Sequence, residues 1–158
     1  VDLQPADVEI LTTTEGAPYV HCPPLESIGG VPVVSLTHSK SMIVAGAARP
    51  GAVLGIDIEA SDRDTAAIDR ALTDRESEMV ESGVTRTIEV LVAKEAAAKA
   101  VGTGLGGNIR RWPVMARDPW KHSLIVAGPD DASTLWPVML LRPPGAVLGI
   151  CYERRDRT

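Results

Sequence analysis

The segment from residue 87 to 101 constrains the fold of this chain most strongly. Apolar residues such as Ile88 and Leu91 recur there at steps of three and four through an alanine-rich stretch, and Gly102 follows it. This spacing is typical of a helix with one apolar face, and a glycine just beyond the last turn is a common helix end. The sequence therefore predicts one long helix in the middle of the chain.

Short β-branched runs bounded by glycine and proline lie on both sides of this helix. Such runs predict strands. We expect strands at 8–13, 33–36, 42–48 and 53–58, short helices at 65–72 and 74–81, and strands at 109–115, 123–127, 135–141 and 146–152. The order of strands, helices and strands favours an α+β domain, an antiparallel sheet packed against a long helix, over a doubly wound one.

The size and composition fit a single domain spanning residues 1–158. The chain is 44% hydrophobic and 23% charged. A domain of this length buries about 68–70% of the surface that its unfolded chain exposes, so it can form a core without disulfide bonds or a bound metal ion. Cys22 and Cys151 lack the close spacing of a metal or redox motif, which favours a reducing, cytoplasmic setting. No apolar run approaches the ~20 residues that span a bilayer, so we expect no membrane partner. The start at Val1 suggests a processed chain or a domain cut from a longer one.

The net charge of the chain argues against one class of partner, nucleic acids. The net charge is -5, whereas general nucleic-acid binders present a basic surface. We therefore expect no nucleic-acid partner. Basic residues are mostly arginines, yet two of the four lysines, Lys94 and Lys99, fall within six residues of each other.

One hexapeptide occurs twice. The sequence Gly-Ala-Val-Leu-Gly-Ile stands at 51–56 and again at 145–150, each time after an Arg-Pro element. Two buried strands of similar composition are the simpler interpretation, and two halves related by a pseudo-twofold axis are the alternative.

The first copy of the hexapeptide leads into two acids. In Ile56-Asp57-Ile58-Glu59 the isoleucines and acids alternate, so Asp57 and Glu59 project from one face of a strand. Such a pair suits Mg²⁺, which takes one or two carboxylates and completes its shell with water and phosphate. A solvated strand end is the alternative, because two ligands alone do not make a metal site.

Two further segments carry groups suited to chemistry. Glu95 and Lys99 lie four residues apart on one face of the long helix with Lys94 beside them, which is also the spacing of an ordinary helix-stabilising pair. His38, between Thr37 and Ser39 where two expected strands join, can bind phosphate or act as a base, or can be purely structural. The glycine-rich segment 102–107 follows a helix rather than opening one, so it is interpreted as a connector and not a dinucleotide loop.

These three elements together, in this order, closely resemble the 4'-phosphopantetheinyl transferase superfamily. The family pattern is a Ser/Thr-His-Ser element, a Gly-Ile/Val-Asp-x-Glu strand and a Lys-Glu-Ala/Ser-x-x-Lys helix, which correspond to residues 37–39, 55–59 and 94–99. The resemblance extends from residue 5 to about 107 and, more loosely, to the closing strand at 145–151. The histidine element is similar to the larger, surfactin-synthetase-activating type, and the start at Val1 fits a domain of a polyketide or fatty-acid synthase.

The resemblance implies a 4'-phosphopantetheinyl transferase-like fold and a Mg²⁺-dependent enzyme. It would transfer the phosphopantetheine arm of coenzyme A to a serine of an acyl or peptidyl carrier protein and release 3',5'-ADP. Asp57, Glu59 and Glu95 would bind the metal, and Glu95 would also accept the serine proton. Lys99 would stabilise the leaving group, and Lys94 would add positive charge at the diphosphate.

The resemblance also implies a coenzyme A site. Thr37, His38 and Ser39 would bind its phosphates, including the 3'-phosphate. Where the larger type often has Gly-Lys-Pro, this chain has Ala17 in place of the lysine, and its N-terminal half is short. Leu91 and Val92 stand where the family usually has an aromatic and a small polar residue.

Three interpretations follow from the sequence. The first is an active transferase; a surface containing Arg110, Arg111, Arg117 and Lys121, with Trp112 and Trp120 as apolar anchors, would dock the carrier protein, although both tryptophans are equally suited to the core. The second is a docking or structural module of a larger synthase that has lost catalysis, which Ala17 and the short N-terminus favour. The third is another Mg²⁺-dependent phosphoryl enzyme with the same acids.

Overall fold

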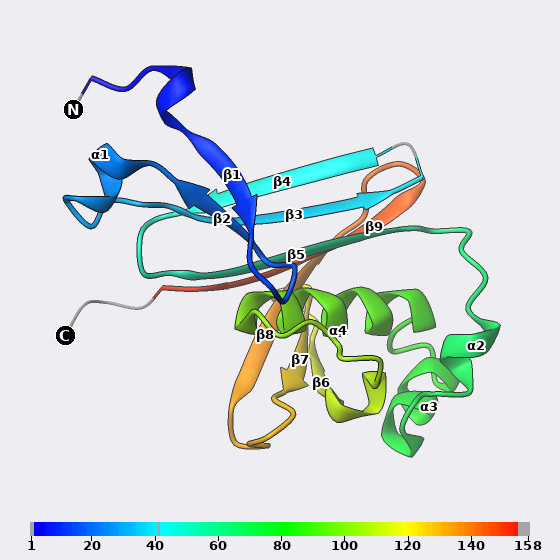
Figure 1. Ribbon diagram of the computed structural model, residues 1–158. Coiled ribbons are helices and arrows are strands. Elements are labelled where there is room, and N and C mark those ends of the chain that lie inside the picture. Colours follow the sequence, from blue (N-terminus) through cyan, green and yellow to red (C-terminus); the bar gives the residue numbers. More distant parts are fainter. Residues whose placement is uncertain (1, 41, 155–158) are drawn as a thin grey trace.

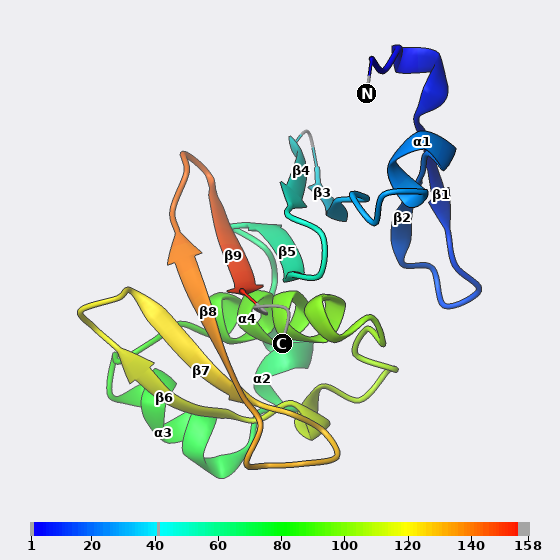
Figure 2. The ribbon, with the colours of Figure 1, turned by 90° about the vertical axis from the view of Figure 1, so that its left-hand side faces the viewer.

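A central helix packed on an antiparallel sheet organises the molecule. The computed structural model describes residues 2–40 and 42–154. Helix α4 (Thr87–Val101) lies across one face of a five-stranded sheet with the order β5-β9-β8-β7-β6 (Figures 1 and 2), and every neighbouring pair in that sheet is antiparallel. The predicted α+β class, with an antiparallel sheet packed against a long helix, is confirmed.

The remaining elements surround this core. Two separate hairpins, β1-β2 and β3-β4, lie on the β5 side of the sheet, and helices α2 and α3 lead from β5 to α4 (Figure 2). The bounds are β1 Glu9–Thr12, β2 Pro18–His21, α1 Pro23–Glu26, β3 Val33–Ser39, β4 Met42–Ala48, β5 Val53–Ala60, α2 Ala66–Asp69, α3 Asp74–Glu81, β6 Val114–Asp118, β7 Ser123–Ala127, β8 Leu135–Leu141 and β9 Ala146–Glu153.

The core lies between α4 and the sheet. Alternate residues of β7, β8 and β9, such as Leu124, Val138 and Val147, are buried in one cluster with Val92 and Ala96 of the helix. Helix α4 is apolar around most of its circumference, because strands and neighbouring segments enclose it. Among the described residues, no helix is both long and apolar enough to cross a membrane.

The two copies of the hexapeptide are neighbouring antiparallel strands. In the register of β5 and β9, Ile56 pairs with Ile150, its own counterpart in the repeat, and Gly55 pairs with Cys151 while Asp57 pairs with Gly149. This pairing has local twofold symmetry. The symmetry ends with the preceding strands, since β8 pairs with β9, whereas in the described part of the chain β4 pairs with β3 and not with β5.

Both second glycines of the repeat bring α4 close to the sheet. A Cβ atom on Gly55 would lie 2.0 Å from the carbonyl oxygen of Ala96 and 2.3 Å from the amide nitrogen of Ala100. A Cβ atom on Gly149 would lie 2.7 Å from a methyl group of Val92. Only glycine permits this distance between helix and strands.

The structure differs from the sequence predictions in three places. Residues 37–39 belong to β3 rather than to a connection. The strand predicted at 109–115 is a 3-10 turn at Ile109–Arg111 followed by β6, because the Asn108 side chain caps the turn and Pro113 has no amide hydrogen for a ladder. Strand β2 and helix α1 were not predicted.

Candidate active site

The candidate site lies where β3, β5 and α4 meet. Because residues alternate along β5, Asp57 faces α4 on the same side as Gly55. The ammonium group of Lys99, on the last turns of α4, lies 2.7 Å from Asp57 Oδ1. The hydroxyl of Thr37 on β3 donates to the same oxygen at 3.1 Å. Two side chains, one from α4 and one from β3, thus converge on one carboxylate oxygen of β5.

The second oxygen of Asp57 is left without a partner. Oδ2 is buried, and among the described residues no group hydrogen-bonds to it. Burial raises the pKa of Asp57, although Lys99 and Thr37 act in the opposite direction. An orphaned buried acceptor is costly in a folded protein, so Oδ2 is a natural ligand for a cation.

Glu95 adds a second acid to this group. It lies one helical turn before Lys99, and its side chain is half-buried. Burial raises the pKa of Glu95, and the negative charge of Asp57 raises it further. Two carboxylates that repel each other in a partly buried place are stabilised by a cation between them or by a shared proton.

The donor set fits a magnesium ion, but not with all three predicted ligands assembled. Within residues 2–40 and 42–154, no three acidic, histidine or cysteine side chains come close enough to form a metal centre. Glu59 is instead engaged by the guanidinium of Arg63 and by Ser39, which donates at 3.3 Å. Because Mg²⁺ usually takes only one or two carboxylates and fills its shell with water and substrate phosphate, Asp57 and Glu95 are the two acids that would hold such an ion.

Lys94 is not part of this group. Its side chain is 0% exposed, and its ammonium lies 2.8 Å from the equally buried carboxylate of Glu76 on α3. It also donates to the Ile109 carbonyl at 3.1 Å. The expectation that Lys94 faces a diphosphate does not fit this placement, because a substrate cannot reach a fully buried, ion-paired ammonium. Adjacent residues of a helix point about 100° apart, which separates Lys94 from Glu95.

Residues 37–39 divide between the two faces of β3. Thr37 and Ser39 are buried and face β5, whereas His38 is exposed on the opposite face. The Thr37 hydroxyl accepts from Lys99 Nζ at 3.2 Å and from the Ile58 amide at 3.4 Å, and donates to Asp57. One donation and two acceptances fill the capacity of a hydroxyl, which does not fit the expected contact with a coenzyme A phosphate.

A cavity opens beside this group. It has a volume of about 360 Å³ and is lined by Glu95 and Lys99, by β3, by the segment after α4 and by the β1-β2 turn. Gly16 and Ala17 of that turn and Pro18 at the start of β2 line the cavity. Sequence analysis compared residues 16–18 with the Gly-Lys-Pro motif of the family but could not place them at this cavity. The cavity brings together these residues and α4, which are far apart in the chain.

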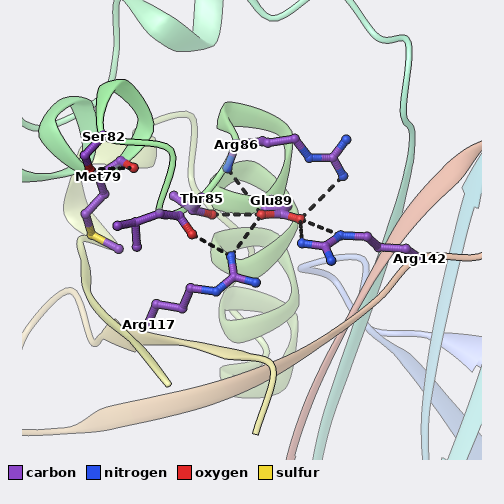
Figure 3. A network of polar contacts seen from close by, with 8 residues as sticks. Met79, Ser82, Thr85, Arg86, Glu89, Arg117 and Arg142 are labelled. Atoms are coloured by element: carbon purple, nitrogen blue, oxygen red, sulfur yellow. Dashed lines mark hydrogen bonds and ion pairs between the residues drawn. The ribbon is translucent and has the colours of Figure 1, made fainter. Parts of the chain in front are cut away.

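A second polar cluster lies at the start of α4 (Figure 3). The fully buried carboxylate of Glu89 is bound by Arg142, by Arg117 at 3.3 Å and by Arg86, and Thr85 donates to it at 3.0 Å. Burial by itself would raise the pKa of Glu89, but Arg142 and the other donors outweigh it and hold the pKa below 4.5. This cluster joins β6, α4 and the β8-β9 turn, and sequence analysis did not single it out.

The predicted pair of tryptophan anchors is separated. Trp112 is 2% exposed and belongs to the core, whereas Trp120, in the β6-β7 turn, is 92% exposed. Arg117 is engaged by Glu89 and by the Val84 carbonyl. The other residues of the proposed surface, Arg110, Arg111 and Lys121, are exposed like Trp120, and Arg111 is paired with Asp130.

Comparison with known proteins agrees with this arrangement. The model of the 4'-phosphopantetheinyl transferase superfamily matches residues 53–150, which include both β5 acids, the whole of α4 and most of β9. A search of curated proteins finds no match. The family transfers phosphopantetheine to carrier proteins, so its partners are carrier proteins and coenzyme A. The match covers well over half of the chain, and the chain therefore belongs to the 4'-phosphopantetheinyl transferase superfamily.

Proposed function

We propose that this protein transfers the 4'-phosphopantetheine arm of coenzyme A to a serine of an acyl or peptidyl carrier protein, with Mg²⁺, and releases 3',5'-ADP. The observation that supports this most strongly is the buried, unpartnered Oδ2 of Asp57, whose other oxygen is paired with Lys99. Lys99 and Glu95 in turn line a cavity of about 360 Å³. Other Mg²⁺-dependent phosphoryl enzymes would use the same acids, but the match to this family favours coenzyme A as the donor.

The acids of the site have separate tasks in this proposal. Asp57 and Glu95 would hold Mg²⁺, which neutralises charge on the diphosphate of coenzyme A when bound. Glu59 would not bind the metal directly, because Arg63 and Ser39 already engage its carboxylate. The pKa of Glu95 is raised by burial and by Asp57, and a carboxylate of raised pKa is a better acceptor for the serine proton.

Lys99 would stabilise the leaving group. Its side chain is 30% exposed and lines the cavity, and Asp57 and Thr37 hold its ammonium from one side. A preoriented cation costs no reorganisation when negative charge develops on the departing phosphate of 3',5'-ADP. Because Asp57 keeps the ammonium in place, Lys99 is positioned before the substrate binds.

The outer face of β3 would extend the coenzyme A site. His38 is exposed there, and an imidazole can donate a hydrogen bond to a phosphate. The presence of the Thr-His-Ser element at the end of β3, two strands before the one that carries Asp57, supports the larger, surfactin-synthetase-activating type, within a synthase or as a separate protein in the cytoplasm.

One observation favours a second function, a docking module of a larger synthase without catalysis. Ala17 lines the cavity at the place where the larger type has a phosphate-binding lysine. The loss of this cation would weaken the hold on coenzyme A. The catalytic proposal is nevertheless preferred over the docking module. A protein without catalytic activity gains nothing from a buried carboxylate oxygen that has no partner and stands next to a second acid.

The test is the mass of an apo acyl carrier protein after incubation with the chain, coenzyme A and Mg²⁺. We expect the mass of the carrier protein to rise by one phosphopantetheine arm. This rise should be absent when the metal is chelated or when the Asp57→Asn variant is used in place of the native chain. Asp62→Asn is the matched control, because Asp62 is an exposed acid on the same segment, paired with Lys40. No mass gain, together with no binding of coenzyme A by calorimetry, would reject the enzyme and favour the docking module.

A further inference from the structure

Strand β3 is joined to β5 by side-chain hydroxyls. The amide of Ile56 donates to Ser35 Oγ at 3.0 Å, that of Ile58 to Thr37 Oγ1 at 3.4 Å and that of Ala60 to Ser39 Oγ at 3.1 Å. Each donor lies 21 residues after its acceptor, so the two strands run in the same direction with a constant offset. β5 is an edge strand of its sheet, and three hydroxyls take the place that carbonyl groups of a sixth strand would occupy.

Two of these hydroxyls continue to the acids of the candidate site. Thr37 donates its hydrogen to Asp57 Oδ1 at 3.1 Å, and Ser39 donates to Glu59 Oε2 at 3.3 Å. A hydroxyl that accepts from a backbone amide directs its own hydrogen away from that amide. The β5 backbone therefore orients each hydroxyl, and each hydroxyl orients the carboxylate of the residue just before the donating amide.

We infer that Thr37 is a positioning residue for Asp57, and that it sets the metal affinity of the site rather than binding coenzyme A. Its hydroxyl and the Lys99 ammonium both occupy Oδ1. Oδ2 is thereby the oxygen left for a cation. The Thr37 hydroxyl has no remaining capacity for a phosphate, because it also accepts from Lys99 and Ile58.

The chain contains its own control for this inference. Ser35 accepts the Ile56 amide as Thr37 accepts the Ile58 amide, but the preceding residue of β5 is Gly55, which has no carboxylate. Removing the Ser35 hydroxyl leaves one β5 amide without an acceptor and touches no acid. Removing the Thr37 hydroxyl does the same and also removes one of the two groups that hold Asp57 Oδ1, so that Lys99 alone remains there.

The experiment compares Thr37→Val, Thr37→Ser and Ser35→Ala with the native chain. Binding of Mn²⁺, as a spectroscopic substitute for Mg²⁺, is measured by electron paramagnetic resonance with coenzyme A present and carrier protein absent. Coenzyme A binding in a chelator is measured by calorimetry, and Tm is measured for every variant. Partners that orient a metal ligand typically change metal affinity by ~10–100-fold, so we expect Thr37→Val to weaken Mn²⁺ binding by at least about 10-fold.

The expected controls separate orientation from folding. Ser35→Ala should lower Tm about as much as Thr37→Val and leave Mn²⁺ affinity unchanged, and Thr37→Ser should restore native affinity because it keeps the hydroxyl. Metal-free coenzyme A affinity should stay unchanged in the two Thr37 variants, because Thr37, unlike Ser35, does not line the cavity.

The inference about Thr37 rests on the proposed function, and the remaining outcomes distinguish the failure of one from the failure of the other. Native Mn²⁺ affinity in Thr37→Val, an equal loss in Ser35→Ala, or a loss of metal-free coenzyme A binding confined to Thr37→Val would overturn the positioning role and leave the transferase proposal standing. A native chain that binds no Mn²⁺ in the presence of coenzyme A would overturn both.

Discussion

Replacing Gly55 with alanine tests how closely α4 must lie against β5. The added Cβ atom would stand 2.0 Å from the Ala96 carbonyl oxygen and 2.3 Å from the Ala100 amide nitrogen. Both are backbone atoms inside a helix, so no rotamer change relieves the contact. To reach even 3.0 Å, the helix must move from the strand by about 1 Å, in a core packed to near-crystal density.

The expected cost follows from this displacement. Overpacking a core costs about 1–3 kcal/mol and occasionally more, and two backbone clashes place Gly55→Ala at or above the upper end. A loss of about 3 kcal/mol corresponds to a fall in Tm of about 6–12 °C for a domain of this size. The same movement would draw Lys99 away from Asp57. In the native chain, Lys99 Nζ lies 2.7 Å from Asp57 Oδ1.

The assay is urea denaturation of the native chain, Gly55→Ala and the control Gly46→Ala. A Cβ atom on Gly46 would meet only side-chain atoms of Leu54 and Ile56, at 3.4 Å or more. That variant should stay within about 1 kcal/mol of the native chain, because the contact is ordinary and alanine lowers the entropy of the unfolded state. If Gly55→Ala loses less than about 1 kcal/mol, the close approach of α4 is refuted.

Three further predictions concern other parts of the molecule. The pKa of Glu89 is held below its unfolded value of 4.5 by Arg142 and Thr85 against the effect of burial, so its contribution to stability is complete above about pH 4.5 and disappears as the pH falls through the folded pKa. Glu89→Gln should therefore flatten the pH dependence of the unfolding free energy below about pH 4.5, and an unchanged slope would contradict this assignment. Burial raises the pKa of Cys151 to about 12, so the native chain should leave this thiol unlabelled by iodoacetamide at pH 8 while the denatured chain is labelled, as mass mapping would reveal. Trp120→Ala should raise the KM for the carrier protein without altering coenzyme A affinity, because the indole is 92% exposed and remote from the core; an unchanged KM would remove Trp120 from the docking surface.

Local sequence patterns were enough to predict most elements of the fold. The 3- and 4-residue apolar steps located α4 at its observed bounds, and the helix predicted at 74–81 is α3. The alternation of Ile56, Asp57 and Ile58 predicted that the acid and the isoleucines point to opposite faces of a strand, and the structure shows that the acid's face is the one toward α4. These signals succeed because helix and strand periodicities are properties of neighbouring residues.

Other features depend on contacts between distant residues. Lys94 and Lys99 look equivalent in the sequence, yet Glu76 of α3 pairs with the first inside the core, and Asp57 of β5 pairs with the second at the cavity. The division of residues 37–39 between two faces of β3 required β5 as a neighbour, since only its amides show which hydroxyls are engaged.

The sequence by itself determined the class of the fold, the long central helix and the residues that define the family, because each of these is written in short-range spacing. The tertiary structure alone decided which oxygen of Asp57 is left without a partner, which lysine reaches the cavity and which hydroxyls orient the acids. These choices are made by packing between β3, β5 and α4, whose contacting residues are about 20 to 60 positions apart in the chain, and no local pattern carries such information.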